Sequence, residues 1–334
     1  MPVLYLTEQG ATVHKDGDLF TITKEGNVLQ KVPAIKVEQV VVFGNVNLTT
    51  PVIHYLLHQG IDCVFCSSYG KFHGRLISTE SRFGLLRQRQ TELILQPDKR
   101  LAVARAFVSG KLRNQRTLLM RYRRELEIPQ LDNAVEELWL AEQKLMKCGD
   151  LAELRGIEGV ASAAYYRAFK NILKRDLGFT SRVRRPPTDP VNSMLSLGYT
   201  LLVYAIQAAV NTVGLDPFQG FLHAPEPSRP SLVLDLMEEF RPVIVDSLVL
   251  WLVNSSVMSE DDFKRPEAEG RMVVLTEEGM KKFLHHYEQR VQTAVYHPRA
   301  HGQVTYRRCF ELQARELAEA VLKQEPNYRP FLVR

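Results

Sequence analysis

The first residue whose type and position could support catalysis is Glu158, which stands between Gly156 and Gly159 in an otherwise apolar segment. We expect it to open a helix over residues 159–175. At a helix start, backbone N–H groups and the helix dipole favour an ionised carboxylate. Such a carboxylate is a candidate metal ligand. The alternative is that Glu158 only stabilises the first helical turn.

A histidine and an acidic pair follow further along the chain. His223 ends an apolar run just before a proline-rich loop, where its neutral ring can bind a metal or make a structural hydrogen bond. Asp235 and Glu238 are three residues apart, so they share one face of a helix whose other side chains are mostly apolar. Two such acids repel each other unless a cation joins them. That cation is either a divalent metal or, in part, the side chain of Arg241.

Together, these side chains suit a site for Mg²⁺ or Mn²⁺, built from carboxylate oxygens and one imidazole. An ion of this kind stabilises the charge that develops on a phosphodiester and activates the attacking oxygen. We therefore predict that Glu158, His223, Asp235 and Glu238 are catalytic.

Basic residues are concentrated between Arg82 and Arg124, where only Glu92 and Asp98 are acidic, although the net charge of the whole chain is only +5. This run predicts contacts with a nucleic-acid backbone, and a solvated helix face is the alternative. Tyr165 is predicted to stack on an unpaired base or to lie in the core. The arginines predicted to bind DNA are Arg87, Arg113, Arg116, Arg182, Arg184 and Arg185.

The elements that must position these residues change character near residue 85. Before it, short β-branched and aromatic runs alternate with glycine-containing turns; after it, the spacing is helical. Strands followed by helices predict an α+β chain with a β-rich domain over residues 1–82 and a larger all-α domain over residues 83–334. We expect helices at roughly 98–126, 130–148, 159–175, 190–213, 231–256, 276–292 and 303–323.

Two features could indicate other classes of protein. Cys63 and Cys66 have the spacing of a redox or zinc motif, but no second pair completes a zinc site, so a buried strand is favoured. The segment 190–215 carries no charge, but its polar residues favour a buried helix over a membrane span. With no secretory signal at the N-terminus, a cytoplasmic protein is expected.

Four motifs occur in an order that resembles one known family. They are the Glu158 segment with Ala-Ala-Tyr-Tyr, then Arg-Arg-Pro-Pro-Thr-Asp-Pro-Val-Asn-Ser-Met-Leu-Ser-Leu-Gly-Tyr, Gly-Phe-Leu-His, and Leu-Asp-Leu-Met-Glu-Glu-Phe-Arg-Pro. This pattern resembles CRISPR-associated protein one, the integrase and endonuclease of spacer acquisition in bacteria and archaea. The similarity extends over nearly the whole chain.

The resemblance implies a β domain that mediates homodimerisation and a helical catalytic domain. It implies that Glu158, His223 and Glu238 hold the metal, that Asp235 assists them, and that Asn192 packs beside the ligands. Other members of the family place aspartate where this chain has Glu238. The division of roles between Asp235 and Glu238 is therefore open.

The resemblance also implies the reaction. The 3′-hydroxyl of a spacer fragment attacks a phosphodiester at a CRISPR repeat, and branched DNA is the half-integrated form. No nucleotide cofactor is needed, and two dimers flank a dimer of CRISPR-associated protein two. The alternative function is a non-enzymatic nucleic-acid-binding scaffold.

Overall fold

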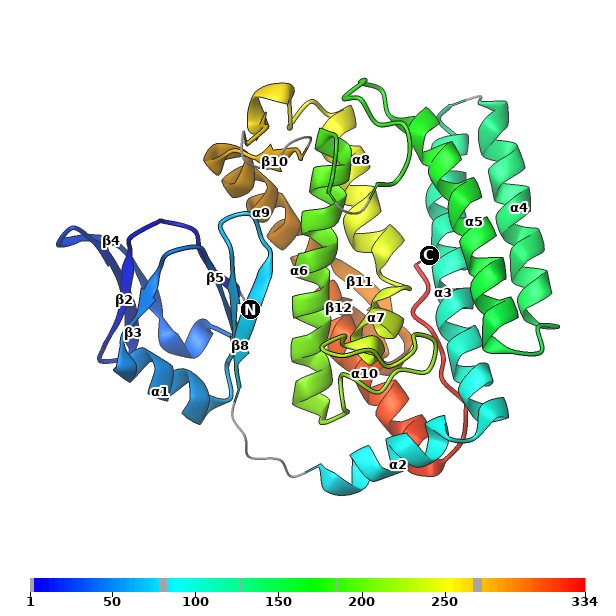
Figure 1. Ribbon diagram of the computed structural model, residues 1–334, viewed down its shortest axis with the longest axis horizontal. Coiled ribbons are helices and arrows are strands. Elements are labelled where there is room, and N and C mark those ends of the chain that lie inside the picture. The colour runs from blue at the N-terminus through cyan, green and yellow to red at the C-terminus, as the bar shows by residue number, and fades with distance from the viewer. Residues whose placement is uncertain (1–2, 78–82, 127, 184–185, 267–271, 334) are drawn as a thin grey trace. The chain divides into compact units, whose positions relative to one another are not determined.

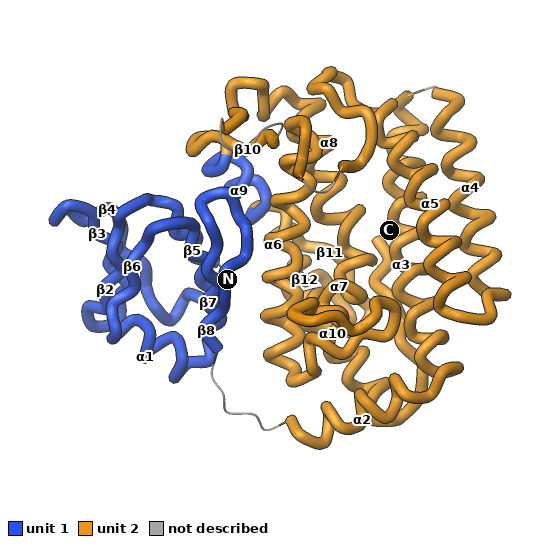
Figure 2. The backbone as a smooth tube through the Cα atoms, viewed as in Figure 1, with its two compact units in different colours: residues 1–81, 280–288 blue, residues 82–279, 289–334 orange. Residues whose placement is uncertain are grey.

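The computed structural model describes residues 3–77, 83–126, 128–183, 186–266 and 272–333 (Figure 1). The chain divides into two compact units (Figure 2). Unit 1 comprises residues 1–81 and 280–288, and unit 2 comprises residues 82–279 and 289–334. Strands come first and helices follow, so the predicted α+β class is confirmed.

Unit 1 contains two four-stranded sheets. In the first, β1, β5 and β7 are parallel and β8 is antiparallel to β7. In the second, β2, β3 and β4 are antiparallel, and β6 is parallel to β2. The strands are β1 (Val3–Leu6), β2 (Thr12–Asp16), β3 (Leu19–Lys24), β4 (Asn27–Pro33), β5 (Gln39–Phe43), β6 (Asn47–Leu48), β7 (Asp62–Cys66) and β8 (Phe72–Leu76).

The core of unit 1 forms because apolar residues fall on the inner strands. All five residues of β5 are buried, as expected for a parallel strand that is covered on both faces. A 3₁₀ turn (Ala34–Lys36) and helix α1 (Thr50–Gln59) complete the unit, and Gly60 ends α1 with a positive φ. Cys63 and Cys66 are buried on β7, which confirms the predicted strand. Burial raises the pKa of the Cys63 thiol to about 12, so redox or metal chemistry is disfavoured there.

Unit 2 is built mainly from helices. They are α2 (Gly84–Ile94), α3 (Pro97–Arg123), α4 (Pro129–Leu145), α5 (Leu151–Ile172), α6 (Pro190–Val213), α7 (Ser231–Met237), α8 (Ser247–Asn254), α9 (Glu277–Gln292) and α10 (Tyr306–Lys323), of which α9 is shared with unit 1. Two short hairpins, which the sequence analysis did not anticipate, add β9 (Phe263–Lys264), β10 (Val274–Leu275), β11 (Ala294–His297) and β12 (Gly302–Thr305). Short 3₁₀ turns occupy Glu260–Asp262 and Pro298–Ala300.

Helix α6 is the apolar segment that could suggest a membrane span. It is long and apolar enough to cross a membrane, but 72% of its most apolar window is buried inside the protein. Its buried side chains include Leu195, Leu202 and Ile206, and it contacts α7, α8 and α10. We therefore interpret α6 as the central core helix of unit 2, as the sequence predicted.

Helix α5 begins earlier than the sequence analysis expected. Asp150 is its N-cap, because its side chain accepts hydrogen bonds of 2.8 Å from the N–H groups of Ala152 and Glu153. Glu158 therefore lies about two turns inside the helix, and the expectation that it stands at the helix start is wrong. Gly156 and Gly159 do not interrupt the helix, which is anchored by the buried side chains of Leu154 and Ala161 and those that follow.

This continuous helix predicts opposite effects of alanine at different glycines. A Cβ at Gly156 or Gly159 meets no atom within 4 Å, so alanine there should raise the free energy of unfolding by about 0.5–1 kcal/mol. Gly214, which ends α6, has a φ of +93°, and its Cβ would lie 2.0 Å from Phe83 Cγ. Gly214→Ala should therefore lower stability by about 1–3 kcal/mol. Urea unfolding of the three variants measures this, and destabilisation by both alanines in α5 would contradict the continuous helix.

Candidate metal-binding site

The candidate site is centred on two carboxylates that share one ammonium group. Lys111 on α3 pairs with Glu158 Oε1 on α5, and its Nζ also lies 2.7 Å from Oε2 of Glu238, just after α7. The side chains of Lys111 and Glu238 are only 8% and 6% exposed, whereas that of Glu158 is 24% exposed. The structure thus brings two predicted ligands together, with Glu158 on the more accessible side.

Glu238 lies at a break in the helical backbone, between the end of α7 and a π-helical turn. The sequence predicts one helix over residues 231–256, but α7 ends at Met237 and a π-helical turn, Arg241–Asp246, precedes α8. Pro242 has no N–H, so it cannot continue the α-helical hydrogen bonds back to Glu238. Single π-helical turns of this kind are frequent at functional sites. Arg241, the first residue of this turn, pairs with Glu238.

Two cations hold Glu238 in its charged form. Arg241 Nε lies 3.2 Å from Glu238 Oε1, on the other side of the carboxylate from Lys111. Burial alone would raise the pKa of Glu238, but Arg241 and Lys111, with a smaller contribution from His223, lower it to about 2. In turn, burial would lower the pKa of Lys111, but Glu238 and Glu158 raise it above its ordinary value. Glu238 and Lys111 are therefore both ionised at neutral pH.

Asp235 has a different role, because both of its oxygens are occupied by the loop that carries His223. Oδ2 accepts hydrogen bonds from the N–H groups of Phe221 and Leu222 at 2.6 and 2.9 Å. Oδ1 accepts from the N–H of His223 at 3.0 Å and lies 2.6 Å from its Nδ1. A proton held on Nδ1 by Asp235 leaves the lone pair on Nε2 available for a ligand. Asp235 is thus a positioning residue in this geometry.

The His223 loop is held from other directions as well. A Cβ at Gly220 would lie 2.8 Å from Asp235 Oδ2, so only glycine allows this close approach. Arg100 donates to the carbonyl of Phe221 at 2.8 Å, and Arg155 donates to that of Leu222 at 2.9 Å. These contacts fix the loop of His223 beside Asp235.

Asn192 and Arg182 organise a neighbouring segment. The Asn192 side chain accepts hydrogen bonds from Arg182 Nη1 and Val183 N, and it donates to the carbonyl of Ser181. The guanidinium groups of Arg182 and Arg241 lie 5.4 and 4.7 Å from the ring centroid of Tyr199. Arg182 is partly buried and engaged in polar and cation–π contacts within unit 2, and its predicted contact with DNA stays a prediction. Arg184 and Arg185 lie outside the described residues.

Tyr165 does not lie where a base could stack on it. The side chain is fully buried, and its hydroxyl donates a 2.8 Å hydrogen bond to Asp246 Oδ2. Tyr199 also donates to Asp246, and Tyr166 and Tyr199 share a hydrogen bond of 2.7 Å. The prediction that Tyr165 binds DNA is therefore wrong for this structure, and its core alternative is correct. Burial raises the pKa of Asp246 to about 6 despite these hydroxyl donors.

The remaining predicted DNA contacts are arginines that also bind other parts of unit 2. Arg87 donates to the carbonyl of Gly214 at 3.2 Å. Arg113 and Arg116 lie 3.4 and 3.3 Å from the carboxylate of Glu142 on α4, although their side chains are 45% and 25% exposed. These pairs join α3 to α4. This geometry is compatible with a purely structural role of Arg113 and Arg116, and also with phosphate binding along α3 and α4.

The C-terminal segment fixes α3 against the residue next to Glu238. Glu239 accepts hydrogen bonds from Tyr328 and from the N–H of Phe331, and Asn114 on α3 donates to the carbonyls of both Glu239 and Phe331. Figure 1 shows this segment returning along α3. Lys111 lies three residues before Asn114, and Glu238 directly precedes Glu239. Both charged residues are therefore close in the sequence to the same buried hydrogen-bond network.

Lys111, Asp246 and Glu239 had no assigned role in the sequence analysis. Lys111 stood in the basic run, but Phe107, Val108, Leu112 and Gln115, its helical neighbours, are all buried. The apolar character of most of these neighbours was the available signal that this lysine faces the core. No local pattern links it to Glu158 or Glu238, which are far away in sequence.

The donor atoms fit a divalent metal, although the carboxylates now enclose an ammonium. Among the described residues, no three histidine, cysteine, aspartate or glutamate side chains already surround one point as metal ligands do. However, the buried Glu238 Oε2 accepts no well-aligned hydrogen bond despite its proximity to Lys111. Two carboxylates and one imidazole are the donors that Mn²⁺ and Mg²⁺ sites use. Glu158, Glu238 and His223 would hold the ion.

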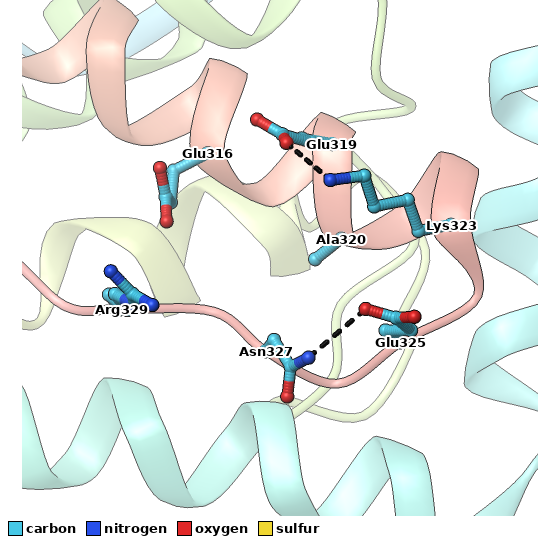
Figure 3. Close-up of a pocket in the computed structure, with 7 residues that line it drawn as sticks. All are labelled: Glu316, Glu319, Ala320, Lys323, Glu325, Asn327 and Arg329. Carbon is cyan, nitrogen blue, oxygen red and sulfur yellow. Dashed lines mark hydrogen bonds and ion pairs between the residues drawn. The ribbon is translucent and has the colours of Figure 1, made fainter. Parts of the chain in front are cut away.

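A separate pocket lies between α10 and the C-terminal segment (Figure 3). It contains none of the predicted site residues, and ion pairs and hydrogen bonds such as Lys323–Glu319 already engage its side chains. Its lining residues are Glu316, Glu319, Ala320, Lys323, Glu325, Asn327 and Arg329.

Comparison with known proteins gives matches over almost the whole chain. Residues 4–289 match the family model described as "CRISPR associated protein Cas1". The chain is 37% identical to "CRISPR-associated endonuclease Cas1 3" of Thermus thermophilus, with 99% of this chain and 97% of that protein covered.

Two solved structures have the same fold at lower identity. One, described as "Casposase bound to integration product", gives a TM-score of 0.84 at 24% identity, covering 98% of this chain and 93% of that one. The other, from a "Cas6-RT-Cas1--Cas2 complex", gives a TM-score of 0.85 at 23% identity, covering 99% of this chain and 36% of that one.

The buried position of Tyr165 leads to a test. Tyr165→Phe keeps the ring and removes only the hydroxyl that bonds Asp246. It should lower the free energy of unfolding by about 1–3 kcal/mol, because a buried acceptor loses a donor, and leave DNA affinity unchanged. Urea unfolding and DNA-binding titrations check both effects. Unchanged stability would contradict the buried hydrogen bond between Tyr165 and Asp246.

Proposed function

Because the chain belongs to the Cas1 family of CRISPR-associated proteins, we propose that it is a metal-dependent DNA endonuclease and integrase that inserts spacers into a CRISPR repeat array. The approach of Glu158 and Glu238 to one ammonium group at a partly accessible site, with His223 held by Asp235 on the helical segment that leads into Glu238, carries this proposal. The names of the relatives support it, since the Thermus protein is called an endonuclease and the casposase is bound to an integration product.

The proposed reaction is a transesterification at a DNA phosphodiester. A Mg²⁺ or Mn²⁺ ion bound at the site would stabilise charge on the phosphate and activate the attacking 3′-hydroxyl. Water in place of this hydroxyl gives DNA cleavage. One phosphodiester is exchanged for another, so the energy of the bond is retained and no nucleotide cofactor is required.

The residues of the site have different roles in the proposed reaction. Asp235 holds the Nδ1 side of His223 and orients the ring, so that Nε2 would be available as a ligand. Arg241 keeps Glu238 ionised and fixed while Glu158 reaches toward the accessible side. Because each ligand comes from a different element, the packing of α3, α5 and the π-helical turn sets the distances between them.

The partners follow from the same proposal. We propose spacer fragments, the CRISPR repeat and branched intermediates as DNA substrates, homodimerisation through unit 1, and assembly with Cas2. The solved complex that contains Cas1 and Cas2 supports the last of these. The reaction would take place in the prokaryotic cytoplasm, where the repeat array lies.

Metal-dependent strand transfer is the direct test of the proposed function. Glu158→Gln, His223→Ala and Glu238→Gln should each slow the rejoining of branched DNA in Mn²⁺ by at least about 100-fold, because each removes a ligand of the ion. EDTA should abolish rejoining by the wild type. The assay follows product strands on denaturing gels after circular dichroism has confirmed that each variant folds.

Glu136→Gln is the matched control, because it makes the same chemical change at an exposed position on α4. It should keep the wild-type rate. If the wild type binds branched DNA but does not alter it with any divalent metal, the enzyme proposal fails and a DNA-binding scaffold becomes the better account.

The arginine pair on α3 can be tested for phosphate binding. If Arg113 and Arg116 contact DNA, replacing both with alanine should lower the slope of log affinity against log salt by up to about 2, since each phosphate contact contributes about 0.9. Glu142→Gln should strengthen binding, because it removes the carboxylate that both arginines face. Salt-dependent fluorescence anisotropy measures both effects. Unchanged slopes in both variants would assign the arginines to helix packing alone.

A further inference from the structure

We propose that Lys111 is an internal counter-cation that holds the metal-free site together and that a divalent ion must displace. This inference rests on the proposed function, because it concerns how the same carboxylates receive their metal. Lys111 would then set the metal affinity of the site, in addition to any role in the reaction.

The Lys111 ammonium lies between two carboxylates that could also bind another cation. Its ammonium bonds Glu158 Oε1 and lies 2.7 Å from Glu238 Oε2, so it joins carboxylates from two different elements. Ser162 Oγ donates a further 2.9 Å hydrogen bond to Glu158 Oε1. The Lys111 side chain is 8% exposed. A buried ammonium with two carboxylate partners serves charge balance rather than contact with solvent or a distant phosphate.

Charge balance explains why the ammonium and the metal compete. Two carboxylates carry two negative charges, of which Lys111 neutralises one and Arg241 contributes toward the other. A divalent ion bound to the same two carboxylates supplies both positive charges by itself. An ammonium retained within a few ångströms would then be repelled by the ion, and burial strengthens this repulsion. Lys111 must therefore withdraw from at least one carboxylate.

The neighbouring residues allow this exchange. Among the described residues, Glu238 Oε2 meets Lys111 at 2.7 Å and has no other polar partner, so a metal reaches this oxygen once that single contact opens. Glu238 keeps its second oxygen near Arg241, so the carboxylate stays ionised and in place when Lys111 leaves. On the accessible side, Glu158 is 24% exposed and can receive an ion from solvent.

Linkage then relates metal affinity to the stability of the metal-free protein. Because Lys111 stabilises the metal-free state more than the loaded state, its removal should destabilise the former and tighten metal binding. We expect Lys111→Met to lower the melting temperature of the metal-free protein by more than about 5 °C. We expect its Mn²⁺ dissociation constant to fall at least tenfold.

The experiment measures Mn²⁺ binding without DNA, by isothermal titration of the metal-free full-length protein and by melting temperature with and without Mn²⁺. Lys111→Arg, which keeps a positive charge, should retain weak binding near the wild-type value. Lys99→Met is the matched control on the same helix: its ammonium contacts the backbone carbonyl of Gln324 rather than a carboxylate. Its Mn²⁺ affinity should equal that of the wild type.

Lys111→Gln covers the case in which the methionine variant does not fold, and it should also bind Mn²⁺ more tightly than wild type. A methionine variant that folds only with Mn²⁺ would support the proposal directly. Equal or weaker Mn²⁺ binding in the neutral variants would overturn it while leaving the metal site intact. Failure of every protein, including the wild type, to bind Mn²⁺ would instead refute the metal-dependent function itself.

Discussion

The constraint on which the site depends is that buried carboxylates must be balanced by positive charge. Glu158 and Glu238 approach one ammonium group, and burial would raise the pKa of Glu238 without a cation. Lys111 and Arg241 supply that charge in the structure, and the pKa of Glu238 falls to about 2 as a result. The same arrangement that stabilises unit 2 would therefore prepare the site for the proposed divalent ion.

The surrounding fold fixes the segments that carry this charge cluster relative to one another. Asp235 fixes the loop of His223 through four contacts, and Glu239 with Asn114 fixes the C-terminal segment between α3 and the π-helical turn. Asp246 anchors the turn from its other end through Tyr165 and Tyr199. Stability and candidate chemistry are thus coupled, because the residues that pack the core also orient the ligands.

Local patterns in the sequence were sufficient for the α+β order and for the strand of Cys63 and Cys66. They also singled out Glu158 and Glu238, which meet at Lys111, whereas the role of these residues and His223 as metal ligands stays a prediction. Local patterns were insufficient where long-range contacts decide. Gly156 and Gly159 suggested a helix start, but tertiary packing carries α5 through both. Tyr165 has the residue type of a DNA contact, yet Asp246, which is distant in the chain, binds its hydroxyl in the core. The contacts of Lys111 were not predicted for the same reason, because its partners Glu158 and Glu238 are distant in the sequence.

The most direct test of this account is a crystal structure of the protein soaked with Mn²⁺, analysed by anomalous scattering at the manganese edge. The account predicts a manganese peak in contact with Glu158, Glu238 and Nε2 of His223, with the Lys111 ammonium withdrawn from at least one carboxylate. Asp235 should still hold the Nδ1 side of the imidazole. A fully loaded crystal with no peak at these residues, or with Lys111 still joining both carboxylates beside a metal bound elsewhere, would contradict it.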